Sequence, residues 1–159
     1  GDFTGGYESP KMCFNAAKSW QLGWYADNHL VVDPVAGSYQ GPLRSNLVFG
    51  SGTSNPILIR INQGGTANNY WLTFNRKDGM NSDTGEGDTS YHDSVVIVSG
   101  TETNGQISVT NHEASLSIGG HCDYTIPKFD GTTHGVVITV ESIDPSRNEA
   151  VISIVYLAR

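Results

Sequence analysis

Short runs of Val, Ile, Leu and aromatic residues recur along the chain, and each run ends at Gly, Asn, Asp or Pro. Runs of this length that are rich in β-branched residues are typical of strands joined by turns. About ten such runs, spaced roughly 10–15 residues apart, predict an all-β fold, a two-sheet antiparallel β-sandwich. We expect strands at residues 29–32, 39–49, 57–61, 70–75, 95–98, 107–109, 114–118, 124–126, 136–140 and 150–156. In the third of these, Ile57, Ile59 and Ile61 alternate with Leu58 and Arg60, which predicts a half-buried strand.

Residues that favour a helix gather near the start of the chain, between Met12 and Leu22. Ala, Lys and Gln predict a short helix there, and Gly23 supplies a stop signal. Trp20 and Trp24 are spaced i, i+4, and we expect them to cover the sandwich rather than to bind sugar. The pattern predicts an N-terminal irregular segment with a short helix, residues 1–25, followed by a β-sandwich domain, residues 26–159.

The composition narrows the function classes. A chain of 159 residues has the size of one domain, and its 19 glycines fit a β protein with many turns. A net charge of −7 without a cluster of Lys or Arg argues against a nucleic-acid partner. No apolar run approaches the roughly 18 residues that a membrane span needs. The chain begins at Gly1 without an initiator Met or a signal peptide, and we interpret it as a mature or excised segment.

The two cysteines, Cys13 and Cys122, leave two interpretations open. An even number in an acidic chain rich in loops favours one disulfide and a secreted, extracellular protein. The alternative is a pair of buried free thiols. Closing so long a loop would stabilise the fold by at most about 4–5 kcal/mol through the entropy of the unfolded chain.

Two blocks of sequence resemble a known family. The first is MCFNAAKSWQLGWY at residues 12–25; the second comprises ILIRIN at 57–62 and YWLTFNRKDGMNS at 70–82, with Glu86 and Gly87 just beyond. Together they cover about a fifth of the chain, and they resemble the C-terminal, post-catalytic region of gametolysin-like secreted zinc metallopeptidases. The resemblance implies that residues 12–25 correspond to the last helix of the catalytic domain. The rest of the chain would be the β-rich domain that follows it.

The zinc site of that family is missing from this sequence. The family uses the motif His-Glu-x-x-His-x-x-Gly-x-x-His, in which one helix turn separates two imidazoles beside a general-base Glu. His112-Glu113 is the only His-Glu pair, and Leu116 stands where the next His is needed. No catalytic residue is therefore carried over, and we expect the chain as given to be no enzyme, although a longer metallopeptidase can contain it.

An acidic turn at residues 78–88 is the best candidate for an ion site. Carboxylate and amide oxygens are hard ligands that suit Ca²⁺, and the glycines of the turn free backbone carbonyls. The alternative is a solvated hairpin loop, and Gly85 breaks the EF-hand pattern. The candidate calcium ligands are Asn81, Asp83, Glu86 and Asp88.

Aromatic residues raise the question of carbohydrate stacking. Tyr70 and Trp71 are neighbours in an expected strand, so their side chains point to opposite faces. We expect one ring in the core and the other exposed. The candidate binding residues are Tyr70, Trp71 and Tyr91.

Three functions remain after these exclusions. The first is a non-catalytic accessory domain that binds or positions matrix material, either a matrix or cell-wall glycoprotein or a polysaccharide. The second is a self-assembling structural or adhesive protein of a cell wall or an extracellular filament. The third is a carbohydrate-binding module.

Overall fold

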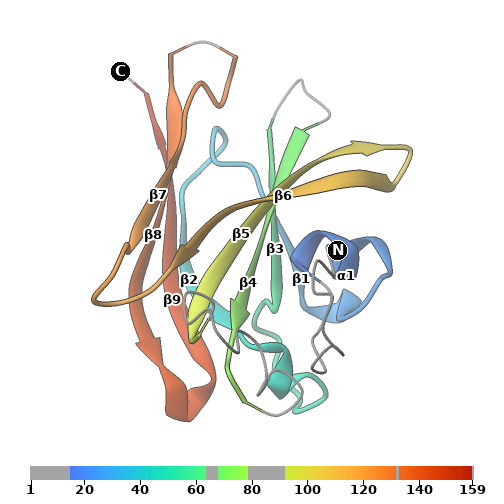
Figure 1. Ribbon diagram of the computed structural model, residues 1–159, viewed down its shortest axis with the longest axis vertical. Coiled ribbons are helices and arrows are strands. Elements are labelled where there is room, and N and C mark those ends of the chain that lie inside the picture. Colours follow the sequence, from blue (N-terminus) through green and yellow to red (C-terminus); the bar gives the residue numbers. More distant parts are fainter. Residues whose placement is uncertain (1–14, 64–67, 79–91, 132, 159) are drawn as a thin grey trace, which may run out of the picture.

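The computed structural model describes residues 15–63, 68–78, 92–131 and 133–158. In these ranges nine strands form two sheets that face each other (Figure 1). Sheet A has the order β1-β3-β4-β5-β6, and sheet B has the order β2-β9-β8-β7. The predicted all-β, two-sheet sandwich is confirmed. The strands are β1 (His29–Val32), β2 (Tyr39–Arg44), β3 (Leu58–Asn62), β4 (Asn68–Asn75), β5 (Ser94–Thr103), β6 (Gln106–Leu116), β7 (Asp123–Ile126), β8 (Gly135–Asp144) and β9 (Glu149–Leu157).

Neighbouring strands are antiparallel except at one edge. β1 pairs with β3 in parallel, with His29 opposite Leu58 and Val32 opposite Ile61. The short helices are α1 (Ala16–Gln21), η1 (Ala26–Asn28), η2 (Asn46–Val48) and η5 (Pro145–Arg147). Within the described ranges, no helix has the length and apolarity needed to cross a membrane.

The main core lies between the two sheets. Alternate residues of each strand point inward, so that residues such as Leu72 and Ile97 of sheet A pack with Ile138 and Ile152 of sheet B. All four side chains are 0 % exposed. Burial of this kind is the dominant favourable contribution to folding.

A second, smaller core lies on the outer face of sheet A, where α1 covers the sheet (Figure 1). Ala16 and Ala17 of the helix pack against a patch that includes Leu58, Trp71 and Val98. Leu58 is 1 % exposed, so β3 is covered on both faces. The half-buried alternation expected for residues 57–61 is therefore wrong.

Polar contacts at both ends hold α1 on the sheet. The Asn15 side chain accepts from the backbone N–H of Lys18 at 3.0 Å and caps the helix. Its Nδ2 atom donates to Thr110 Oγ1 of β6 at 3.0 Å. Lys18 Nζ donates to the carbonyl oxygen of Ile107, and the backbone N–H of Ile107 donates to Gln21 Oε1 at 3.3 Å. The helix is thus tied to β6 along its length.

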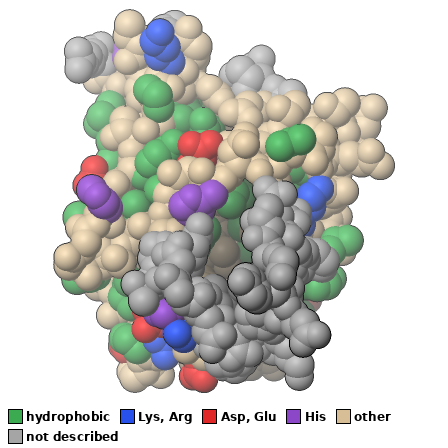
Figure 2. Space-filling model, in the orientation of Figure 1, with side chains coloured by type: hydrophobic (Ala, Val, Ile, Leu, Met, Phe, Trp, Pro, Cys, Tyr) green, Lys and Arg blue, Asp and Glu red, His purple; other side chains and the backbone are tan. Residues whose placement is uncertain are grey.

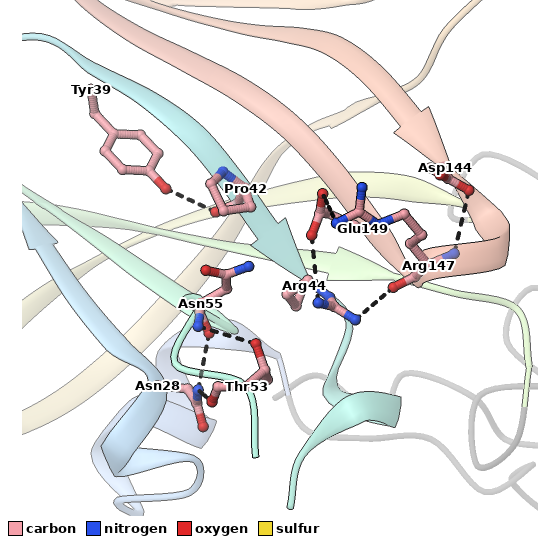
Figure 3. Close-up of polar contacts among 9 residues, drawn as sticks. All are labelled: Asn28, Tyr39, Pro42, Arg44, Thr53, Asn55, Asp144, Arg147 and Glu149. Atoms are coloured by element: carbon pink, nitrogen blue, oxygen red, sulfur yellow. Dashed lines mark hydrogen bonds and ion pairs between the residues drawn. The ribbon is translucent and has the colours of Figure 1, made fainter. Parts of the chain in front are cut away.

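An ion pair fixes β2 to β9 at one end of sheet B (Figure 3). Arg44 and Glu149 are directly opposite in the register, and Arg44 Nη1 lies 3.5 Å from Glu149 Oε2. Arg44 Nη2 also donates to the carbonyl oxygen of Arg147 at 2.8 Å. Glu149 is only 8 % exposed, so the pair lies largely out of solvent.

Candidate functional site

Three aromatic rings, in which a central ring contacts one on either side, form the most distinctive exposed feature of the described chain. The ring centroids of Trp24 and Tyr25 are 6.4 Å apart, and those of Tyr25 and Phe49 are 4.9 Å apart, both in edge-to-face geometry. Trp24 is 41 % exposed and Phe49 is 52 % exposed, whereas Tyr25 is half-buried between them. We call Trp24, Tyr25 and Phe49 the aromatic surface. Exposed apolar groups that adjoin one another mark interaction sites more often than scattered ones do.

The backbone after α1 brings the first two of these rings to the surface. Gly23 has φ = 71° and Tyr25 has φ = 62°, both in the left-handed region. Gly adopts this region freely, while a Tyr there costs on the order of 1 kcal/mol or more. Hydrogen bonds from the backbone N–H of Trp24 to Ser19 O, 2.9 Å, and of Asn28 to Tyr25 O, 2.7 Å, hold the turn. The fold therefore retains a strained residue at the centre of the aromatic surface.

The buried amide of Asn28 joins the two segments that carry the aromatic surface (Figure 3). Its Nδ2 atom donates to Thr53 O at 2.8 Å and to Asn55 O at 3.0 Å, and the backbone carbonyl oxygen of Asn28 accepts from Ile57 N at 2.9 Å. Asn28 is 6 % exposed, so these bonds are shielded from water. Asn28 thus connects the turn of Trp24 and Tyr25 to the loop that carries Phe49.

A stacked pair adjoins the aromatic surface. The rings of Trp20 and His29 lie 3.9 Å apart with an interplanar angle of 12°. His29 Nε2 is 2.7 Å from the carbonyl oxygen of Trp24, and the guanidinium carbon of Arg60 is 5.9 Å from the Trp20 ring centroid. The expectation that Trp20 packs on the sandwich is confirmed, because it lies against the helix-covered core. The same expectation for Trp24 is wrong, since that ring is exposed.

A cluster of polar side chains lies at the side of the sandwich where β6 and β7 are neighbours. Glu113 Oε1 accepts from Ser99 Oγ at 2.5 Å, and Glu113 Oε2 accepts from the Tyr124 hydroxyl at 2.7 Å. The register of β5 and β6 shifts between His112 and Ala114, so Glu113 is the extra residue of a β-bulge. Burial, followed by the Glu113 carboxylate, raises the pKa of Tyr124. We call Ser99, Glu113 and Tyr124 the seam cluster, and its bonds link sheet A to sheet B.

A third cluster ties the loop before β8 to β9. Asp130 Oδ2 lies 2.6 Å from His134 Nδ1 and accepts from the Tyr156 hydroxyl at 2.8 Å. The Asp130 hydrogen bond is the main reason why the pKa of Tyr156 is raised. The His134 and Tyr156 rings are 5.6 Å apart. These contacts hold the loop in place, and among the described residues no Ser, Thr or Cys nucleophile belongs to the cluster. We therefore assign the cluster a structural role.

The two predicted carbohydrate-binding residues in the described chain, Tyr70 and Trp71, are both buried. Trp71 is 0 % exposed beneath α1, and Tyr70 is 9 % exposed in the main core. The expectation that one of the two rings is exposed is therefore wrong. The reason is that α1 covers the outer face of sheet A, so side chains pointing to either face are buried. Neither ring is available for stacking on a sugar, and Tyr91 lies outside the described residues.

The predicted disulfide between Cys13 and Cys122 stays a prediction, because the structure describes only one of the two residues. Cys122 is a half-buried free thiol, and its Sγ atom is 4.0 Å from Asp123 Oδ1. Its expected partner, Cys13, lies outside the described residues, as do the four candidate calcium ligands Asn81, Asp83, Glu86 and Asp88. In the part of the chain that is described, no three His, Cys, Asp or Glu side chains form a group able to hold a metal ion.

Charged side chains are sparse on the face drawn in Figure 2. Lys and Arg appear there as separate spots rather than as a cluster. The aromatic surface contains no charged side chain, and the amide of Asn46 lies beside it, donating to the Tyr25 hydroxyl at 3.4 Å. Uncharged aromatic and amide groups of this kind suit an uncharged, partly apolar ligand.

The sequence contained only part of the signal for this site. Trp24 and Tyr25 stand out as adjacent aromatics after a helix stop, but nothing local shows that Phe49 meets them. That contact depends on Asn28 and on the folded loop.

Comparisons of the chain with protein-family models, with curated proteins and with solved structures give no match.

Proposed function

We propose that this chain is a non-catalytic β-sandwich domain of the gametolysin-like extracellular metallopeptidase type, and that it binds or positions matrix material. The resemblance of residues 12–25, 57–62 and 70–82 to the post-catalytic region of that family supports the class. The absence of the His-Glu-x-x-His motif from the sequence supports a role other than hydrolysis.

The observation that carries the binding role is the aromatic surface. Four of the nine large hydrophobic residues that are exposed in the described chain come from two short segments, residues 22–31 and residue 49: Leu22, Trp24, Val31 and Phe49. Trp and Tyr contribute most to binding where they are held rigidly, because little side-chain entropy is lost on contact. Asn28, in the first of these segments, adds rigidity by donating to the backbone of Thr53 and Asn55, in the loop that follows Phe49. Secretion belongs to the same proposal, since matrix material is extracellular.

A sedimentation assay with insoluble cell-wall material tests the proposal. The double variant Trp24→Ala, Phe49→Ala should lower the affinity at least about tenfold, which corresponds to about 1.4 kcal/mol. Leu157→Ala is the matched control, because Leu157 is 47 % exposed at the far end of β9. Digesting the cell-wall material with protease beforehand separates a glycoprotein ligand from a polysaccharide ligand. Equal binding by the wild type and the double variant would refute the role of the aromatic surface.

A further inference from the structure

The imidazole of His29 is held beside the aromatic surface through its backbone and through its ring. The backbone N–H of His29 donates to the carbonyl oxygen of Ala26, and the residue lies opposite Leu58 of β3 at the start of β1. Its ring stacks on that of Trp20, with the centroids 3.9 Å apart and an interplanar angle of 12°. The position and the plane of the imidazole are therefore both fixed.

The contact with Trp24 determines which nitrogen of the imidazole carries the proton. His29 Nε2 lies 2.7 Å from the carbonyl oxygen of Trp24. A carbonyl oxygen only accepts hydrogen bonds, so Nε2 is the donor, and in the neutral ring Nδ1 is then the acceptor. A residue of the aromatic surface thus sets the tautomer of the histidine next to it.

The second ring nitrogen, His29 Nδ1, is available to a ligand. Among the described residues it has no hydrogen-bond partner, in contrast to Nε2. The described chain has six buried side-chain atoms that lack a hydrogen bond, and His29 Nδ1 is not one of them. A ring nitrogen that is neither bonded nor buried is open to solvent. His29 therefore offers a fixed acceptor at the margin of the aromatic surface.

The charged side chains around the stacked rings balance one another. Arg60 of β3 places its guanidinium carbon 5.9 Å from the indole centroid, and it pairs with Glu102 of β5 at 3.0 Å. Lys18 of α1 is engaged with a backbone carbonyl oxygen of β6, and Asp27 of η1 is exposed to solvent. These two cations and two anions give no net charge, so the described surroundings favour an uncharged ligand.

We propose that His29 is a specificity-determining residue of the aromatic surface, and that its Nδ1 accepts a hydrogen bond from a hydroxyl of an uncharged polysaccharide. The inference rests on the proposed matrix-binding function and names the ligand class for that site. One face of a sugar ring presents C–H groups that pack on exposed rings such as Trp24 and Phe49, and its hydroxyls supply the proton that Nδ1 needs.

The same observations favour a polysaccharide over an extended polypeptide. A polypeptide strand binds mainly through a row of backbone donors and acceptors. The aromatic surface offers rings and single side-chain groups instead, namely His29 Nδ1 and the amide of Asn46 beside the Tyr25 hydroxyl. Few polar groups at fixed positions among apolar rings suit a ligand with a hydroxyl at each ring edge.

A binding assay at two pH values tests the acceptor. The probe is cell-wall material digested with protease, sedimented with the chain at pH 7.5 and at pH 5.5. Histidine gains a proton between these values, which turns Nδ1 into a donor and removes the acceptor. We expect the affinity of the wild type to fall at least about threefold at pH 5.5, in keeping with the loss of one hydrogen bond.

Two variants assign this pH dependence to its residue. His29→Gln keeps an amide donor for Trp24 and an acceptor oxygen, neither of which titrates, so its affinity should be the same at both pH values. His112→Gln is the matched control, because His112 is an exposed histidine of β6, and it should keep the pH dependence of the wild type. The ¹⁵N chemical shifts of the imidazole in the free chain should show the proton on Nε2 at pH 7.5.

The outcomes separate this inference from the proposed function. A proton on Nδ1 at pH 7.5, or an unchanged pH dependence in His29→Gln, would overturn the role of His29. The matrix-binding function would stand in that case if the variant Trp24→Ala, Phe49→Ala still binds more weakly than the wild type. Loss of binding after protease digestion would also overturn the inference, by making a polypeptide the ligand. A wild type that binds no wall material, digested or not, at pH 7.5 would overturn both.

Discussion

The outer faces of the two sheets differ, although both belong to strands of similar length and composition. On sheet A, the outward residues Trp71 and Val98 are 0 % and 4 % exposed, because α1 lies over them. On sheet B, the outward residue Val155 is 39 % exposed, and its neighbours on that face include Thr139 and Ser153. One helix of six residues therefore divides the molecule into a covered half and an open half.

The difference shows how little cover a sheet needs when the covering residues are small. Ala16 and Ala17 have no side chain beyond Cβ, so the helix backbone comes close to the sheet and shields a ring as large as that of Trp71. The open face of sheet B instead mixes aliphatic and hydroxyl side chains, which water tolerates. The face that α1 covers is thus apolar, and the face open to water is partly polar. Substitutions on each face can test this difference separately.

The largest loss of stability is expected from a substitution where α1 packs on sheet A. Ala17→Asp places a carboxylate at a position that is 0 % exposed and packed in an apolar cluster. We expect the free energy of unfolding to fall by about 3 kcal/mol or more, because burying a charge among apolar side chains is costly. Urea denaturation followed by tryptophan fluorescence measures this change.

The matched substitution on the open half is Leu157→Asp, at a position that is 47 % exposed. It should cost about 1 kcal/mol or less, since the new carboxylate stays in water. If Ala17→Asp costs no more than Leu157→Asp, then α1 does not cover the sheet in solution, and the distinction between the two halves fails.

The second effect concerns the seam cluster, where the two halves meet. The folded state raises the pKa of Tyr124 above its ordinary value of about 10, so the folded chain holds this proton to higher pH than the unfolded chain. The stabilisation that results is complete below pH ~10 and is lost as the pH rises above that value. Burial also raises the pKa of Tyr70 and Tyr39, which act in the same direction.

Urea unfolding between pH 8 and pH 11.5 should therefore show stability falling above pH ~10. The variant Tyr124→Phe removes the titrating hydroxyl, so its stability should fall less steeply over the same range. Tyr156→Phe also removes a hydroxyl with a raised pKa, so it measures the part of the fall that comes from the loop and β9 rather than from the seam. If stability falls equally steeply with pH in the wild type and in Tyr124→Phe, then Tyr124 does not contribute to the pH dependence of folding.

Much of the strand pattern could be predicted from the sequence, and the failures have local causes. β1 spans the predicted residues 29–32, and β3, β4, β7, β8 and β9 lie within a few residues of their predictions. Residues 47–49 do not continue β2, because Ser45 caps a 3₁₀ turn by accepting from Leu47 N at 3.3 Å. The two strands predicted at 107–109 and 114–118 are one strand, β6, because the bulge at Glu113 carries the pairing through a polar stretch.

The site was harder to predict than the fold for a physical reason. Whether Trp71 or Trp24 is exposed depends on which surface α1 covers, and this follows from contacts between distant residues such as Asn15 and Thr110. Periodicity identifies the two faces of a strand but does not reveal whether a second layer covers one of them. The same limit explains the wrong half-buried pattern at residues 57–61.

The smallest effect is expected on the open face of sheet B. Val155→Thr exchanges a methyl group for a hydroxyl of nearly the same shape at a strand position that is 39 % exposed. Thr keeps the β-branched side chain that strands favour, so the free energy of unfolding should change by no more than about 0.5 kcal/mol. The same exchange at Val98, which is 4 % exposed under α1, should cost about 1–3 kcal/mol, because the hydroxyl is buried among apolar groups. Urea denaturation of both variants measures the difference, and equal costs would mean that burial beneath α1 does not distinguish the two faces.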